Sequence, residues 1–160
     1  CHPEWIDFPR EGNGWSFHYC RRQWSLLDNG MLKYQWLGDF DRDMLKVTQE
    51  NRIFDQKMGD LLLNKEPEKT LVFYRNGLLF AFNFHPCQSL TNVLVPVPRP
   101  GEYTVELCTD DDKYGGFHQV AHIPYPTKRF DGKDYVELYL PARTAVVLKE
   151  HVILPKEEKK

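Results

Sequence analysis

The sequence has almost no excess charge of either sign, no long apolar run and no paired cysteines. Lysine and arginine total 21 against 23 aspartate and glutamate residues, a formal net charge of −2. Binding of nucleic acid through overall charge would need an excess of basic residues. No apolar run approaches the roughly 20 residues that a membrane-spanning helix requires. These absences exclude nucleic acid and membrane from the expected partners.

The four cysteines are far apart in the chain and form no CxxC pair, so their spacing supports neither a zinc site nor a redox motif. Reduced thiols of this kind are typical of a cytosolic protein. We therefore expect no metal, no cofactor and a cytoplasmic location. The first twelve residues do not have the pattern of a signal peptide, and a start without methionine predicts a segment of a longer protein.

Aromatic residues are unevenly distributed along the chain. All four tryptophans lie within the first 36 positions, whereas the later part is rich in short runs of valine, leucine, tyrosine and phenylalanine. A length of 160 residues allows one ordinary domain, or one domain with part of another. The change in composition predicts two structural regions.

Aromatic rings, carboxylates and two prolines are concentrated in residues 2–13. Each proline holds the residue before it extended, which predicts an ordered loop rather than a helix. Rings supply stacking area, and carboxylates and arginine supply directional hydrogen bonds, so the segment suits a hydroxylated ligand such as a sugar. The alternative is a structural loop in which Trp5, Ile6 and Phe8 fill a core.

Apolar residues recur at steps of three and four through residues 29–51, which predicts an amphipathic helix. The apolar stripe consists of Met31, Tyr34, Leu37, Phe40, Met44 and Val47. Asp28 or Asn29 is expected to cap the first turn. The same segment carries Asp39, Asp41 and Asp43. Helical spacing scatters these aspartates over a solvated face, so we do not assign them a catalytic or metal-binding role.

Residues 70–149 have the pattern of antiparallel β-structure. Asn76-Gly77 between two apolar runs is the strongest short signal for a hairpin. The expected strands are residues 70–74, 78–84, 92–95, 103–107, 135–140 and 145–149. Short strands at even spacing, separated by proline and glycine turns, predict a small sandwich. Residues 52–69 are expected to form a connector that ends in a polar break at 64–69.

Six blocks of sequence carry a family resemblance. They are residues 2–13, 19–24, 32–34 together with 40–44, 78–86, 114–116 and 140–147. In this order they resemble the C-terminal portion of the glycogen and starch branching enzymes of the α-amylase superfamily. Two departures stand out, because Cys1 occupies a position where the family has glycine and the stretch after Gly116 is short.

The resemblance implies a fold that is mainly β with an N-terminal helical arm. Residues 1–65 would be the last loop and last helix of a truncated (β/α)8 barrel, and residues 66–155 an antiparallel β-sandwich, the C-terminal domain of the superfamily. Residues 156–160 would form a frayed charged tail.

The resemblance also implies an activity for the parent protein, which cleaves α-1,4-glucan and transfers the chain to form α-1,6 branches. That chemistry needs two carboxyl groups across the scissile bond, at the carboxyl ends of barrel strands. A barrel takes roughly 250 residues, and no strand–helix–strand pattern occurs here. We therefore assign no catalytic residue to this chain and expect it to be inactive alone, with α-glucan and an upstream barrel as its partners.

Residue by residue, the N-terminal segment matches the loop after the last catalytic aspartate, which shapes the mouth of the active site in the family. The resemblance makes Glu4, Trp5, Asp7 and Arg10 the candidate substrate-binding residues. It also admits a plastid location, if the parent is a plant starch enzyme.

Two other functions fit parts of the sequence. One is a free-standing carbohydrate-binding β module with an aromatic arm, and the other is a protein-interaction domain. The helical stripe needs a covering sheet, which argues against a free module and predicts self-association when the barrel is absent. His118 and His122 have the spacing of metal ligands on a helix, but the flanking glycines and proline predict a loop with solvated or hydrogen-bonded histidines.

Overall fold

The computed structural model describes residues 7–18, 20, 24–56 and 58–152. The chain divides into two compact units, residues 1–42 and residues 43–160. Short turns and the start of one helix make up the first unit, and antiparallel strands make up most of the second. The predicted architecture, mainly β with an N-terminal helical arm, is confirmed.

Helix α1 spans Tyr34–Glu50, so it begins later than the expected residue 29. The reason is local: Asn29 Oδ1 accepts a hydrogen bond from the Met31 N–H at 3.0 Å, and the Asn29 carbonyl accepts one from the Leu32 N–H at 2.9 Å. The asparagine therefore closes a turn instead of capping the helix. The first unit also contains two short 3₁₀ turns, η1 (Glu11–Asn13) and η2 (Trp24–Leu26).

The carboxyl end of α1 is anchored to a β-hairpin. The Asn51 side chain donates to the Val47 carbonyl at 2.9 Å and ends the helix. The hairpin residue Asn76 then donates from Nδ2 to the carbonyl oxygens of Asn51 (2.7 Å) and Arg52 (3.0 Å). The hairpin turn thus satisfies carbonyl groups that a helix end leaves without partners. A short 3₁₀ turn, η3 (Ile53–Asp55), follows.

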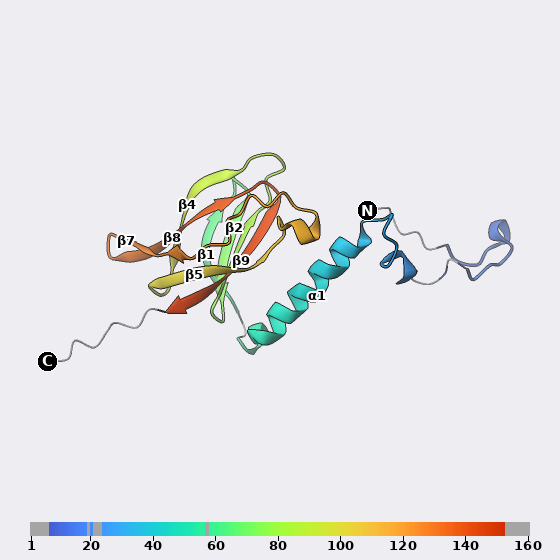
Figure 1. Cartoon of the computed structure of the whole chain (residues 1–160), viewed down its shortest axis with the longest axis horizontal. Helices are drawn as coiled ribbons and strands as arrows, with labels where there is room; N and C mark the ends of the chain where they lie inside the picture. The colour runs from blue at the N-terminus through green and yellow to red at the C-terminus, as the bar shows by residue number, and fades with distance from the viewer. Residues whose placement is uncertain (1–6, 19, 21–23, 57, 153–160) are drawn as a thin grey trace. The chain divides into compact units, whose positions relative to one another are not determined.

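The strands form two antiparallel sheets (Figure 1). Their bounds are β1 (Asp60–Lys65), β2 (Thr70–Arg75), β3 (Leu78–Asn83), β4 (Leu90–Val97), β5 (Gly101–Cys108), β6 (Tyr125–Pro126), β7 (Lys128–Phe130), β8 (Lys133–Leu140) and β9 (Thr144–Val152). The six-stranded sheet has the order β1-β2-β3-β9-β5-β6, and the three-stranded sheet has the order β4-β8-β7. A 3₁₀ turn, η4 (Asp112–Tyr114), lies between β5 and β6.

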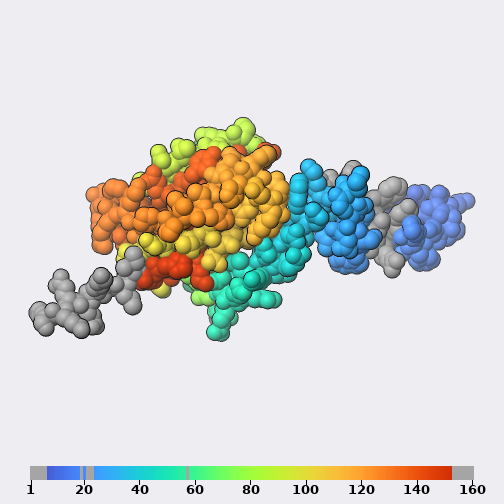
Figure 2. Space-filling model, viewed as in Figure 1, coloured from blue at the N-terminus to red at the C-terminus, as the bar shows by residue number. Residues whose placement is uncertain are grey.

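The hydrophobic core lies between the two sheets. The six-stranded sheet contributes Val72, Leu79, Ala81, Tyr103, Val146 and Leu148, and the three-stranded sheet contributes Val93, Val95, Val136, Leu138 and Leu140. Each fully buried valine or leucine is worth roughly 1.5–3 kcal/mol. Figure 2 shows the β-region, coloured from green to red, gathered into one body. The predicted β-sandwich is confirmed.

The Asn-Gly hairpin forms as its sequence predicts. Asn76 and Gly77 have φ angles of 46° and 82°, the left-handed values that a type I′ turn requires at both central positions. Asp131 and Gly132, between β7 and β8, repeat this geometry with φ angles of 46° and 77°. These two turns set the register of their strands.

One expectation about the connector is wrong. Residues 60–65, which the sequence analysis places in a connector, form strand β1 and pair with β2, with Leu61 opposite Phe73 and Lys65 opposite Thr70. The polar break at 64–69 is the turn of this second hairpin, because Lys69 adopts a left-handed φ of 52° there. Strands β6 and β7 are also additions to the expected set.

Candidate functional site

The N-terminal loop forms a small polar cluster around Asp7. Its carboxylate accepts hydrogen bonds from Arg10 Nε at 3.0 Å, from Arg10 Nη2 at 3.2 Å and from Asn13 Nδ2 at 3.1 Å. The Asn13 side chain also accepts from the Arg10 N–H at 3.0 Å. Of the four candidate substrate-binding residues, Asp7 and Arg10 are therefore brought together, whereas Glu4 and Trp5 lie outside the described residues.

The charges of this cluster stabilise one another. The hydrogen bond from Arg10 is the main cause that lowers the pKa of Asp7, and the same bond raises the pKa of Arg10. Because both groups stay charged and paired at neutral pH, Asp7 is a poor general acid or base. The pair is suited instead to ordering the loop and to accepting and donating hydrogen bonds.

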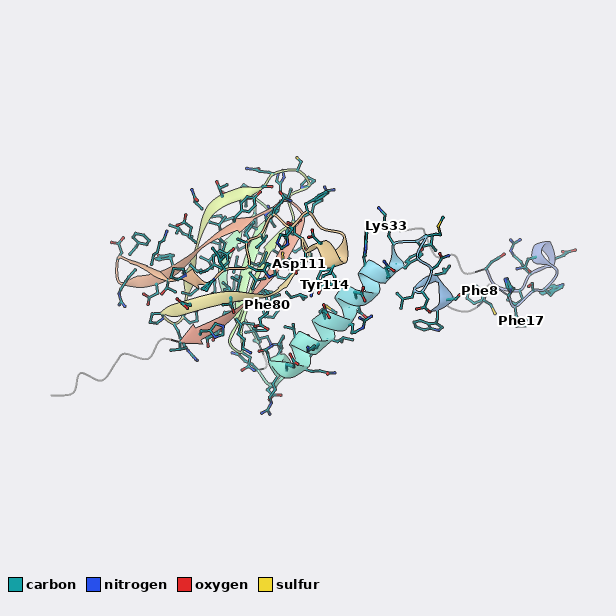
Figure 3. The ribbon with its side chains drawn as sticks, in the orientation of Figure 1. Phe8, Phe17, Lys33, Phe80, Asp111 and Tyr114 are labelled. Atoms are coloured by element: carbon teal, nitrogen blue, oxygen red, sulfur yellow. The ribbon has the colours of Figure 1, made fainter. Side chains whose placement is uncertain are left out.

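Exposed rings surround this loop. Phe8 and Phe17 are 70% and 73% exposed (Figure 3), and Trp15 is 66% exposed. The alternative in which Phe8 fills a core is therefore wrong within this chain. Trp15 and Phe17 were not among the candidate residues predicted from the sequence, although Gly12 and Gly14 before them indicate a turn that projects the following side chains.

Asp43 in α1 has a structural role. Its Oδ2 accepts hydrogen bonds from Lys113 Nζ at 2.8 Å and from the Tyr114 hydroxyl at 2.5 Å, and Tyr114 is labelled in Figure 3. Burial, followed by the hydrogen bond to Asp43, raises the pKa of Tyr114 to about 12. The carboxylate thus joins α1 to the loop after β5, and Asp39 is paired with Arg42 at 2.8 Å. Asp39 and Asp43 therefore both form ion pairs with neighbouring basic side chains.

The loop after β5 also holds the two histidines considered as metal ligands. His122 Nε2 lies 2.8 Å from Asp111 Oδ1, and the rings of His118 and His122 stack with centroids 5.8 Å apart. His118 has a left-handed φ of 52°, so this segment is a loop as predicted. The described residues contain no group of three histidine, cysteine or carboxylate side chains placed to hold a metal ion.

A close approach of two backbones shapes the same loop. A Cβ atom on Gly116 would come within 2.1 Å of the Asp110 backbone, so only glycine fits. The Asp110 carboxylate, which is 6% exposed, accepts the backbone N–H groups of Phe117 (3.0 Å) and Gln119 (2.6 Å). These hydrogen bonds to the Asp110 carboxylate hold the loop in place.

The outer face of the six-stranded sheet carries a stack of phenylalanine rings. Phe73 and Phe80 stack with centroids 4.7 Å apart, and Phe82 stacks on Phe84 at 5.4 Å with the rings almost parallel. Phe73 also stacks on Phe82 at 5.9 Å. We call these four residues the aromatic face, and Phe80 is labelled in Figure 3. This face was not among the features predicted from the sequence.

The cysteines bear out the expectation of unpaired thiols where they are described. Cys20, Cys87 and Cys108 are free, and Cys1 lies outside the described residues. Cys108 is fully buried, and burial raises the pKa of its thiol to about 12. No helix among residues 7–18, 24–56 and 58–152 combines the length and the apolar character that crossing a membrane takes.

Comparison with known proteins identifies similar branching enzymes. The 1,4-alpha-glucan-branching enzymes of Yarrowia lipolytica and Aspergillus oryzae are each 40% identical to this chain over 151 residues, and that of Equus caballus is 38% identical over 151 residues. These alignments cover 91–92% of this chain but only 22% of each relative. The chain therefore spans about a fifth of the length of the relatives that it matches.

A family match covers the β-region itself. The family described as "Alpha amylase, C-terminal all-beta domain" matches residues 63–151, a range that runs from within β1 to within β9. The two-sheet architecture agrees with an all-β domain. Since the match covers more than half of the sequence, this chain belongs to the α-amylase C-terminal all-beta domain family.

Proposed function

We propose that this chain is the C-terminal portion of a 1,4-α-glucan branching enzyme, where it supports a catalytic domain without performing the chemistry itself. The observation that carries the proposal is the 40% identity to the Yarrowia lipolytica branching enzyme along 91% of this chain. The parent protein would cleave α-1,4-glucan and transfer the chain to form α-1,6 branches in glycogen or starch. Its substrate is then an α-glucan.

The aromatic face supports an upstream partner for the β-domain. Phe84 is 60% exposed, and Leu61 at the neighbouring sheet edge is 62% exposed. Phe73, Phe80 and Phe82 are half-buried, so the exposed part of this surface consists of Phe84 and Leu61, and exposed apolar side chains of this kind mark an interaction surface. We assign it to the upstream (β/α)8 barrel that the branching-enzyme assignment implies.

The exposed apolar side chains of helix α1 also support an upstream barrel as the partner. Leu37 and Leu45 are 60% and 51% exposed, and Met44 is 37% exposed. In the parent these side chains would pack on the barrel sheet. In the isolated chain they predict concentration-dependent self-association, which sedimentation velocity measures. Leu37→Lys should weaken the association, whereas Gln35→Lys, which adds the same charge at an exposed neighbour, should not. A chain that stays monomeric at high concentration would contradict this part of the proposal.

The N-terminal loop contributes to glucan binding only within the parent. The ordered Asp7–Arg10 pair, with its exposed neighbours, supports this role. For Glu4 and Trp5, the role is supported by the family resemblance alone. Ordering further loop residues costs roughly 1–2 kcal/mol each in backbone entropy, so a single ring contact in the isolated chain cannot hold a sugar. We also propose a cytoplasmic location for the parent, since the matched relatives come from fungi and animals; a plastid location would require a plant starch enzyme.

The first test is an activity assay on the isolated chain. Amylose is incubated with the purified 160 residues, and iodine colour and branch content are measured, with the intact Yarrowia lipolytica branching enzyme as the positive control. We expect the colour and branch content to stay unchanged in the presence of the isolated chain. Enzymatic branching by the chain alone would refute its supporting role and place the catalytic acids within these residues.

A further inference from the structure

A surface groove of about 510 Å³ runs over the outer side of β8. Outward-facing residues of β8 form its floor, the segment between η4 and β6 forms one wall, and the bulge at the start of β4 forms the other. Its lining includes Asn92, Gln119, Tyr125, Lys128, Glu137 and Tyr139. We call it the β8 groove. Its volume lies within the roughly 300–1,000 Å³ typical of small-molecule sites.

The two charges of the β8 groove neutralise each other. Lys128 Nζ donates a hydrogen bond to Glu137 Oε2 across the β7–β8 pair. The remaining polar lining consists of amides, hydroxyls and tyrosines. A groove with balanced charge gives no net attraction to an anion or a cation, so it favours a neutral ligand.

The uncharged lining is suited to a hydroxylated ring. Tyr125 and Tyr139 are partly exposed, and Asn92 and Gln119 are exposed, with one N–H of the Gln119 amide donated to Asp110 Oδ1 at 3.4 Å. The Tyr125 hydroxyl donates to the Ala121 carbonyl at 2.6 Å, which fixes its ring beside the groove. Fixed aromatic rings offer apolar faces, and amides donate and accept hydrogen bonds. Both features match a sugar, which has apolar C–H faces and hydroxyls around its edge.

The position of the groove leaves the aromatic face available to the barrel. Glu137 and Tyr139 lie on the outer side of the three-stranded sheet, because the residues between them and beside them, Val136, Leu138 and Leu140, point into the core. Phe73 and Phe80 lie on the outer side of the six-stranded sheet. A ligand in the β8 groove would therefore not compete for the surface that the barrel needs.

We propose that the β8 groove binds a segment of α-1,4-glucan, a second contact with the polymer outside any catalytic cleft. This inference rests on the proposed function, which supplies the glucan, and on the neutral, aromatic lining of the groove. Because the groove is open to solvent, an internal stretch of a long chain can enter it without threading an end. The site would hold the polymer near the enzyme and contribute to binding, not to bond cleavage.

The test is a titration of the ¹⁵N-labelled 160-residue chain with maltoheptaose, followed by NMR. We expect saturable shifts confined to the groove, centred on the amide resonances of Asn92, Gln119 and Tyr139. Tyr139→Ala should weaken binding by tenfold or more. Tyr135→Ala, an outward-facing tyrosine of the same strand outside the lining, is the matched control and should change affinity by less than twofold.

Further variants and ligands separate the possible outcomes. Asn92→Gly removes the amide but keeps the left-handed φ of 54° at this position, so it should fold normally and bind several-fold more weakly. Sorbitol at equal hydroxyl concentration should produce no saturable shift. All tryptophans lie in residues 1–36, so tryptophan fluorescence should stay constant during the titration.

Three results would overturn the groove assignment: no saturable shift, shifts centred on the N-terminal loop, or equal losses from Tyr139→Ala and Tyr135→Ala. None of them bears on the proposed function. That proposal fails separately, if the isolated chain branches amylose, and this outcome does not depend on the groove.

Discussion

The buried side chain of Asn83 connects the end of β3 to the three-stranded sheet. It is 1% exposed. Its Nδ2 donates to the carbonyl oxygens of Leu140 (3.0 Å) and Gln88 (2.8 Å), and its Oδ1 accepts the His85 N–H at 2.9 Å. Leu140 ends β8, so one buried amide links the two layers.

The cost of removing this amide can be worked out from its contacts. Three hydrogen bonds at roughly 0.5–1.5 kcal/mol each give a loss of about 2–4 kcal/mol for Asn83→Ala, because the buried Leu140 carbonyl loses its side-chain donor. A loss of 1 kcal/mol shifts the midpoint of a domain this size by roughly 4 °C, so the thermal midpoint should fall by about 8–16 °C. Asn64→Ala, at an exposed asparagine of the same sheet, is the control and should change the midpoint little.

Asn83→Asp gives a sharper form of the test. Its carboxylate would face two carbonyl oxygens with no hydrogen to donate, so folding favours the protonated form and the pKa of the introduced carboxyl rises. Stability contributed by a group with a raised pKa is present at low pH and lost as pH rises. The difference in unfolding free energy between Asn83→Asp and the unsubstituted chain should therefore grow between about pH 4 and pH 7. Urea unfolding followed by circular dichroism measures it, and substitutions that each cost under 0.5 kcal/mol would refute this account of the link.

Three further predictions concern titration, thiol access and the domain boundary. Burial and the hydrogen bond to Glu150 raise the pKa of Tyr74 to about 12, and the pKa of Tyr114 is raised similarly. Since unfolded tyrosines ionise near pH 10, the free energy of unfolding should fall from about pH 10 to pH 12. A free energy of unfolding that stays constant over this range would contradict the burial of both hydroxyls. Iodoacetamide at pH 8 should label exposed Cys87 in the native chain but buried Cys108 only after unfolding, as peptide mass spectrometry will show. A truncation to residues 66–155 should still unfold cooperatively, at a lower temperature than one that keeps the edge strand β1; a disordered spectrum would place the boundary before β1.

Local signals in the sequence predict much of the β-domain. The Asn76-Gly77 turn is predictable because asparagine and glycine both tolerate positive φ, a property of the residue types alone. The strands on either side follow from short apolar runs. By contrast, strand β1 could not be predicted from the sequence, because the turn that follows it has the composition of a linker and places a lysine at a left-handed φ. This turn is Glu66-Pro67-Glu68-Lys69.

Features that depend on distant residues could not be read from the sequence. Asp43 bonds to residues about seventy positions away, so its role is not visible in the helical pattern. The aromatic face was missed because Leu79 and Ala81 point into the core while Phe80 and Phe82 point outward. A strand that is apolar on both sides looks like a fully buried strand. The β8 groove likewise combines three separate segments that only the folded sheet brings together.

The most direct test of the central claim is a domain exchange. The part of the Yarrowia lipolytica branching enzyme that aligns with this chain, about 22% of that protein, is replaced by residues 1–160, and branch formation in amylose is measured. We predict that the chimera retains branching activity, that the truncated enzyme without this part loses it, and that Phe82→Asp on the aromatic face abolishes it in the chimera. A soluble, folded chimera without activity, or a truncated enzyme with full activity, would contradict the claim that this chain supports the catalytic domain of a branching enzyme.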